Sequence, residues 1–271
     1  MKPSCLYILT GLLIPAITHP AFEEVDFSAR AGAMGGAYVG LSDDGSGLFY
    51  NPAGLSQLRS GEITFYTTQL FGFKELTYLI FVYGQPFPYG SFGLGFSQFG
   101  NNRYKEQIGV LGYSNQWSKI LIGGSLKGMN LSISEYSSSQ AFGLDVGILW
   151  KIQENLSLGM AGKNINGPEL GKGEELPQSI LFGLSFRPAR ELLFNIDLVQ
   201  DFDLDPQVRV GQEYLLSDHF AFRAGWLTSP QTFTGGFGYG FQGFHLNYGI
   251  RSHPALGLTH GIALSYLLRR E

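Results

Sequence analysis

The sequence predicts an all-β protein: a transmembrane antiparallel β-barrel of about 14 strands, with an N-terminal segment inside the barrel as a hatch. Three observations support this fold class. From Gly61 onward the chain alternates large apolar residues with small ones, as strands do. Charged residues make up only 15% of the 271 residues, whereas 38 are glycine and 14% are aromatic. A stretch crowded with glycine and alanine precedes the first strand, and no later stretch resembles it.

The alternation assigns the two faces of the predicted wall. Phe92, Leu94 and Phe96 share one face and glycines occupy the other, and the pattern recurs at Phe237, Tyr239 and Phe241. In a soluble β-sandwich, the alternative fold, the small face would meet water and would be rich in charged residues. We therefore expect the large face to meet lipid and the small face to meet the lumen.

Two further expectations follow from this assignment. Aromatic residues near strand ends, among them Phe99, Tyr113 and Trp150, are typical of the girdles at the two membrane interfaces. A small inward-facing residue should accept a small polar replacement, such as Gly93→Ser.

Residues 1–21 are predicted to be a signal peptide. Lys2 precedes an apolar run from Cys5 to Ile17 that is too short to span a bilayer, and Ala21 suits a cleavage site. A buried N-terminal strand is the alternative. Because Cys5 is the only cysteine, the cleaved chain would have no disulfide and no thiol chemistry.

Residues 22–60 are the predicted hatch. Its glycines, including Gly35 and Gly36, allow close backbone approach and positive φ. Asn51 is a good N-cap and Pro52 suits the first position of a short helix at residues 52–58. Asp43 and Asp44 allow two interpretations, a cation site or a capping loop, and the second is favoured because no further ligand spacing accompanies them.

Residues 61–271 are the predicted barrel. The two longest connections, residues 128–140 and 164–178, fall on the same side, as expected for the outer loops of such a barrel. An even number of strands places both chain ends in the periplasm. The predicted strands are residues 62–71, 76–85, 91–99, 105–115, 119–127, 141–151, 156–163, 179–187, 192–200, 207–215, 219–227, 233–241, 244–251 and 258–268.

A few charged residues fall on the lumen-facing side of these strands. Asp197 and Arg209 lie on adjacent strands and are expected to face each other. The set forms either a polar path or ion pairs that hold the hatch to the wall, and we favour the ion pairs. The predicted polar wall comprises Asp145, Asp197, Arg209, Glu213, Arg223, His245 and Arg251.

The sequence gives no sign of an enzyme. The five histidines lack metal-ligand spacing, no serine has a nucleophile-elbow pattern, and no phosphate loop or dinucleotide fingerprint is present. A net charge of −4 gives no reason to expect nucleic acid as a partner. We predict no metal and no cofactor.

The run from Ala29 through Leu55 resembles the N-terminal region of FadL/TodX-like and PorV/PorQ-like outer-membrane proteins. The resemblance rests on three boxes, AR-x-GAMGGA, the Asp43-Asp44 pair and NPAGL, and on the last strand, which looks PorV/PorQ-like. It implies an outer-membrane barrel with a lumenal hatch. The hatch or gating candidates are Arg30, Gly35, Gly36, Asp43, Asp44, Asn51, Pro52, Gly54 and Leu55.

The resemblance implies two functions. FadL-like members move hydrophobic molecules, so passive transport of such molecules across the outer membrane is the first expectation. The short outer connections depart from that family. The alternative is a non-transporting scaffold or a component of type IX secretion. The expected partners are outer-membrane lipid with a small hydrophobic ligand or secretion-system proteins, and the chain is expected to be a monomer.

Overall fold

The computed structural model describes residues 21–22, 25–171, 173–202 and 204–268. The predicted signal peptide lies outside the described residues except for Ala21. The elements before the barrel are α1 (Ala29–Ala33), α2 (Gly47–Tyr50) and the 3-10 helix η1 (Pro52–Gln57), and two more 3-10 helices, η2 (Leu70–Gly72) and η3 (Lys74–Leu76), follow the first strand. The strands are β1 (Glu62–Gln69), β2 (Thr77–Phe87), β3 (Gly90–Gly100), β4 (Tyr104–Trp117), β5 (Ile120–Ile133), β6 (Ser137–Gln153), β7 (Leu156–Lys163), β8 (Glu169–Leu170), β9 (Glu174–Glu175), β10 (Ser179–Ala189), β11 (Leu192–Asp201), β12 (Gln207–Leu215), β13 (Phe220–Thr228), β14 (Gln231–Phe241), β15 (Phe244–His253) and β16 (Gly257–Leu267).

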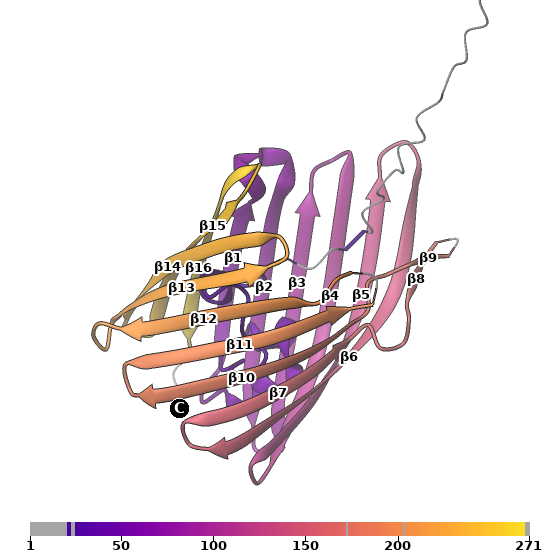
Figure 1. Ribbon diagram of the computed structural model, residues 1–271. Coiled ribbons are helices and arrows are strands. Elements are labelled where there is room, and N and C mark those ends of the chain that lie inside the picture. The colour runs from indigo at the N-terminus through magenta and orange to yellow at the C-terminus, as the bar shows by residue number, and fades with distance from the viewer. Residues whose placement is uncertain (1–20, 23–24, 172, 203, 269–271) are drawn as a thin grey trace, which may run out of the picture.

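Within the described chain, 14 strands close into an antiparallel barrel (Figure 1). Each barrel strand pairs with the next barrel strand in sequence, so that β7 pairs with β10. β16 closes the barrel on β1, with Glu62 opposite Leu267. The closing strands continue past the sheet, because Leu268 N donates to Gly61 O over 2.7 Å. We call this end of the barrel the lower end and the opposite end the upper end. The predicted barrel of about 14 strands is confirmed, and a soluble sandwich is excluded.

Two predicted connections are different in the structure. The hairpin of β5 and β6 continues to Ile133 and resumes at Ser137, so the predicted outer loop at residues 128–140 is mostly strand. The connection after β7 contains the short β8–β9 hairpin, which sequence reasoning left as loop. β5 and β6 were predicted too short because Ser137, Ser138 and Ser139 interrupt the apolar pattern that marks a strand.

The large side chains point outward, as predicted. Leu94 and Tyr239 are 44% and 47% exposed, and the glycines between such residues face the lumen. Soluble monomers rarely expose an apolar surface this large. On β6 the apolar surface ends at Phe142, because the outward residues above it are Gln140 and Ser138. Phe99 differs from the prediction: its ring stacks on Tyr78 against the lumenal core, so it does not belong to an outer girdle.

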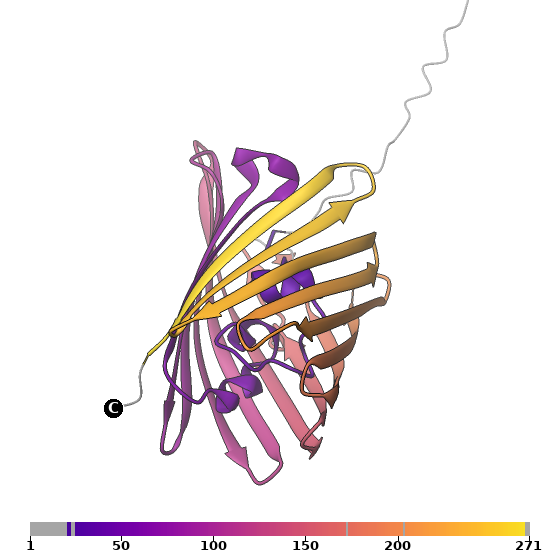
Figure 2. The same cartoon turned by 90° about the vertical axis from the view of Figure 1, so that its left-hand side faces the viewer.

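Residues 25–60, which we call the N-terminal segment, run inside the barrel (Figure 2). Ala21 lies at the upper end, where it packs against β5 and β6, whereas Gly61 lies at the lower end. The prediction that both chain ends lie on one side does not fit the described chain. The first and last strands begin and end at the lower end, but the chain enters at Ala21 at the upper end. None of the described helices has the length and apolarity needed to cross a membrane.

The outward position of Leu94 gives a first prediction. Leu94→Arg places a charge in the middle of the apolar surface, where it costs roughly 2–4 kcal/mol in a bilayer. Leu204→Arg makes the same change at a loop residue outside the strands. We expect a lower folded yield in lipid vesicles for Leu94→Arg alone, measured by the heat-modified mobility of the folded barrel. Equal yields would contradict a lipid-facing surface.

Candidate functional site

The inner wall carries a belt of glycines that faces the N-terminal segment. Most strands contribute one, and cross-strand pairing places neighbours side by side, as in Gly159–Gly183 and Gly211–Gly225. A Cβ at Gly159 would overlap the carbonyl oxygen of Val39, and one at Gly225 would overlap the amide nitrogen of Gly35. The glycine belt consists of Gly84, Gly93, Gly112, Gly123, Gly147, Gly159, Gly183, Gly211, Gly225, Gly236 and Gly249.

Along the chain, the segment contacts the glycines of one strand after another around the barrel, from β15 back towards β2. Ala29 lies against Gly249 on β15, Ala33 against Gly236 on β14, and Ala53 against Gly123 on β5. Gly35 and Gly36 have φ of 69° and 75°, which lets the chain turn after α1 and continue along the wall. The segment therefore follows most of the inner circumference, with its backbone pressed against the sheet.

The inner face at Gly93 is in contact with the segment. A Cβ at Gly93 would lie 3.0 Å from Leu55 and 3.2 Å from Leu48, so Gly93→Ser requires the ends of these two side chains to shift, and its tolerance stays a prediction. Leu55 is fully buried at this contact. Sequence reasoning treated the small face as a lumen lining, whereas it is a contact surface for the chain's own N-terminal segment.

Asn51 joins three parts of the site. Its Oδ1 accepts from Ala53 N over 3.2 Å, which caps η1 behind Pro52 as predicted. Its Nδ2 donates to Val39 O over 3.0 Å and to Ile148 O on β6 over 3.1 Å. Gly54, three residues on, is required because a Cβ there would overlap the carbonyl oxygen of Ser42.

Arg30 is the centre of a buried charge cluster. Its guanidinium binds Glu213 on β12 through Nε at 2.9 Å and Nη2 at 3.0 Å, and Asp43 through Nη1 at 2.6 Å. Arg223 on β13 donates to the same Glu213 over 2.7 Å and to Asn247 over 2.8 Å. Burial alone would lower the pKa of Arg30, but Asp43 and Glu213 raise it well above its usual value, so Arg30 is charged.

The two aspartates take part in this cluster. Asp44 Oδ2 accepts from the Tyr38 hydroxyl over 2.6 Å, and its Oδ1 accepts from Ser46 N over 3.0 Å just before α2. Burial raises the pKa of Tyr38 well above its usual value, so the hydroxyl keeps its proton and donates it. Among the described residues, no group of acidic, histidine or cysteine side chains is arranged to hold a metal ion.

The remaining residues of the predicted polar wall point inward, but each has its own partners. Asp197 lies opposite Arg209 in the register, yet its Oδ2 accepts from the backbone N–H groups of Tyr38 and Val39 over 2.6 and 2.8 Å. Arg209 Nε donates to Gln207. Asp145 pairs with Lys127 over 2.7 Å. Asp197 thus holds the segment to β11, whereas Asp145 holds β5 to β6.

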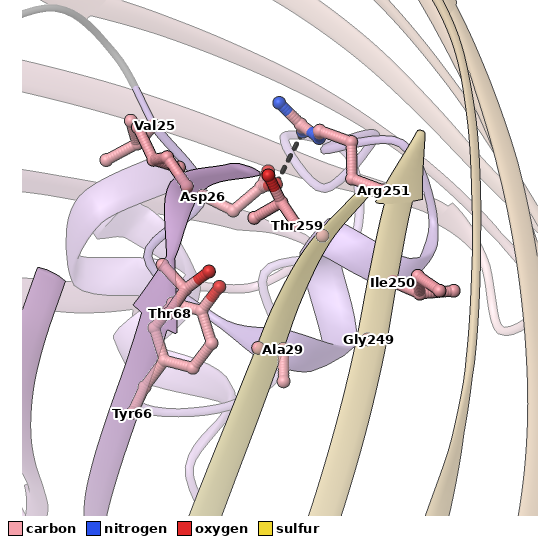
Figure 3. A pocket seen from close by; sticks show the side chains of 12 residues that line it. Val25, Asp26, Ala29, Tyr66, Thr68, Gly249, Ile250, Arg251 and Thr259 are labelled. Carbon is pink, nitrogen blue, oxygen red and sulfur yellow. Dashed lines mark ion pairs between the residues drawn. The ribbon is translucent and has the colours of Figure 1, made fainter. Parts of the chain in front are cut away.

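Arg251 anchors the beginning of the segment. It pairs with Asp26 over 2.5 Å at the upper side of α1, beside a pocket of about 40 Å³ (Figure 3). The pocket lies between Asp26, Tyr66, Thr68 and Thr259 and has room for a few water molecules only.

Two cavities with charged residues in their walls lie below the segment. One, of about 490 Å³, extends from Asp43 and Gln57 to Lys151 and Arg187. The other, of about 390 Å³, lies under the Arg30 cluster and includes His245. Asp43 and Glu62 line both cavities.

The upper half of the lumen is apolar on one side. Met129, Leu131 and Ala141 of β5 and β6 pack against Leu170 and Leu176 of the connection after β7, with Ala21. We call this group the upper apolar cluster. Ile108 packs against it and also against the larger core around Leu48 and Tyr50 of the segment. Apolar side chains therefore continue from the upper end down to the segment.

Comparisons with known proteins support the fold. Residues 124–225 match the family model described as "F plasmid transfer operon, TraF, protein". No curated protein matches the chain. Among solved structures, the chain is similar to a deletion mutant of the TodX monoaromatic hydrocarbon channel at TM-score 0.71 and 15% identity, covering 90% of this chain and 99% of that one.

Two further structures give the same result. The Pseudomonas putida toluene transporter TodX aligns at TM-score 0.67 and 14% identity, covering 91% of this chain and 98% of that one. A Pseudomonas aeruginosa FadL homologue aligns at TM-score 0.62 and 11% identity, covering 90% and 99%. The predicted FadL/TodX-like fold is thus supported, whereas the comparisons give no support to a relation with PorV/PorQ proteins.

Proposed function

We propose that this protein is an outer-membrane channel for passive entry of small hydrophobic molecules, with the N-terminal segment as the hatch across its lumen. The observation that carries the proposal is the run of packed apolar side chains from the upper apolar cluster through Ile108 to Leu48 and Tyr50. An apolar molecule that takes the place of these packing contacts gains free energy in proportion to the apolar area that it removes from water.

Other features agree with this proposal. The apolar outer surface suits a membrane, and the similar solved structures include channels for toluene and other monoaromatic hydrocarbons. The upper end would then face the cell exterior, and the two lower cavities would face the periplasm, where a released molecule passes to water or to a carrier. No observation favours the secretion role, so we do not propose it.

Uptake tests the proposal. A radiolabelled monoaromatic hydrocarbon at low concentration should enter cells that express the protein faster than cells that lack it. Leu131→Asn removes apolar surface from the upper apolar cluster and should reduce the rate by about tenfold, which corresponds to ~1.4 kcal/mol of lost contact. Ser132→Asn changes the neighbouring residue, whose side chain points to the other face of β5.

Two results would count against the channel. One is an uptake rate that does not depend on the protein, and the other is an equal loss of uptake in both variants. Folded protein in the outer membrane is measured in parallel, so that a change in amount is not taken for a change in rate.

A further inference from the structure

The N-terminal segment does not contact the wall evenly. Residues 29–41 and 51–58 lie along the glycine belt, and we call them the ring. Residues 42–50 leave the wall near Gly183 on β10, cross the lumen, where the Leu48 side chain contacts the opposite wall at Gly93 and Gly112, and return at Gly147 on β6. We call residues 42–50 the central loop. Its two ends lie close together, as in an Ω-loop.

Side chains of the ring hold both ends of the central loop. Gln57 Nε2 donates to Leu41 O over 2.6 Å and to Ser42 O over 3.2 Å, which holds the departing chain. At the returning end, Asn51 donates to Val39 O over 3.0 Å. Ser42 adopts a φ of 36°, so the chain turns sharply at this point. Residues 43–50 can therefore move while the hydrogen bonds of Gln57 and Asn51 at the two ends of the loop stay intact.

The body of the loop is held by a different kind of contact. Its polar contacts include Asp43 and Asp44 with Arg30 and Tyr38, Gly45 N with Glu62 over 3.0 Å, and the Tyr50 hydroxyl, which accepts from Phe27 N over 3.0 Å. Its apolar contacts are Leu48 and Phe49 against glycines of β3 and β4, and Phe49 stacks on Phe27 with ring centroids 4.4 Å apart. By contrast, the ring is pressed against backbone atoms of the sheet.

The loop also has empty space beside it. Both cavities at the lower end are lined by Asp43, of which 29% of the side chain is exposed. A close-packed element cannot move without free volume. Asp43 and Asp44 of the central loop border this volume, and so do Arg30, Leu41, Gln57 and Leu58 of the ring, so the two parts differ in how they contact the sheet and not in their access to free space.

From these observations we propose that the N-terminal segment has two functional parts: the ring is a fixed lining of the barrel, and the central loop is the gate. The inference rests on the proposed function and specifies how that site opens. A small hydrophobic molecule that arrives past Ile108 replaces the apolar contacts of Leu48 and Phe49. The loop then moves into the lower cavities and the ring keeps its place.

Engineered disulfides separate the two parts. Gly45→Cys with Val82→Cys ties the loop to β2, because a Cβ at residue 45 lies 3.4 Å from Cγ1 of Val82. Ser56→Cys with Ser114→Cys ties the ring to β4, where the two hydroxyl oxygens are 2.7 Å apart. Both pairs are made with Cys5→Ser, since Cys5 is the only natural cysteine.

We expect the oxidised loop pair to lose hydrocarbon uptake and to regain it on reduction, and the oxidised ring pair to keep the wild-type rate. Undiminished uptake by the oxidised loop pair would overturn the inference, and so would an equal block by the ring pair. Formation of each disulfide is verified by mass spectrometry.

Amide hydrogen exchange tests the inference without any solute. In the wild type, amides of residues 43–50 should exchange about tenfold faster than those of residues 30–40 and 53–57, because locally opened segments exchange first. Equal protection throughout would overturn the division. If the wild type shows no protein-dependent uptake, the proposed function fails, and the exchange result still decides whether the loop and the ring are separate.

Discussion

Gly159→Ala should weaken the attachment of the N-terminal segment to the barrel. The added methyl group would overlap the carbonyl oxygen of Val39 and lie 2.7 and 2.9 Å from the carbonyl carbon of Val39 and Cα of Gly40. Backbone atoms cannot rotate away as a side chain does, so either the segment or β7 must move. Overpacking of this kind costs typically 1–3 kcal/mol, and we expect the upper part of that range.

The displacement should spread to two neighbouring contacts. Asp197 accepts from the N–H groups of Tyr38 and Val39, and Asn51 donates to Val39 O. Chemical unfolding in detergent would measure the loss of stability, and amide exchange would show faster exchange at Tyr38 and Val39.

Gly109→Ala is the matched control for this change. Gly109 lies on β4 with no atom within 4 Å of an added Cβ. That variant should be as stable as the wild type or more stable by a few tenths of a kcal/mol, since alanine restricts the unfolded chain. Equal stability of Gly159→Ala and Gly109→Ala would show that the segment does not press on the wall.

The strands and their faces could be predicted from the sequence because alternation is a local signal. Phe237, Tyr239 and Phe241 need only their immediate neighbours to be assigned to one face. The cap at Asn51 was predictable for the same reason, since an N-cap and a proline at the first helical position lie next to each other. The hairpin of β5 and β6 was missed above Phe142, where the outward residues become polar and the alternation ends.

The contacts inside the barrel were not predictable, because they depend on the register and on the path of the segment. Glycines recur along the strands, but the sequence around them does not show that Gly211 and Gly225 lie opposite each other. It also does not show that the backbone at Gly35 packs against Gly225. Arg30 and Glu213 are 183 residues apart, so sequence reasoning named both without joining them. Glu62 and Tyr38 contribute to the same cluster and were not among the candidates.

Glu213→Ala should cause a large loss of stability. Glu213 is 3% exposed and accepts hydrogen bonds from both Arg30 and Arg223. Its removal leaves two guanidinium groups close together without the carboxylate between them. Breaking a buried pair in this way costs roughly 3–5 kcal/mol, because a charge is left uncompensated away from water.

Two further variants show whether this loss belongs to the buried cluster. Asp218→Ala breaks an exposed pair with Arg190, in which both side chains are more than 70% exposed, and should cost about 0–1 kcal/mol. Adding Arg223→Ala to Glu213→Ala removes one of the two facing charges and should restore part of the stability, as coupled neighbours do. Unfolding in detergent measures all three. A Glu213→Ala loss no larger than that of Asp218→Ala would mean that the cluster does not hold α1 to β12, and that the glycine belt alone positions the ring.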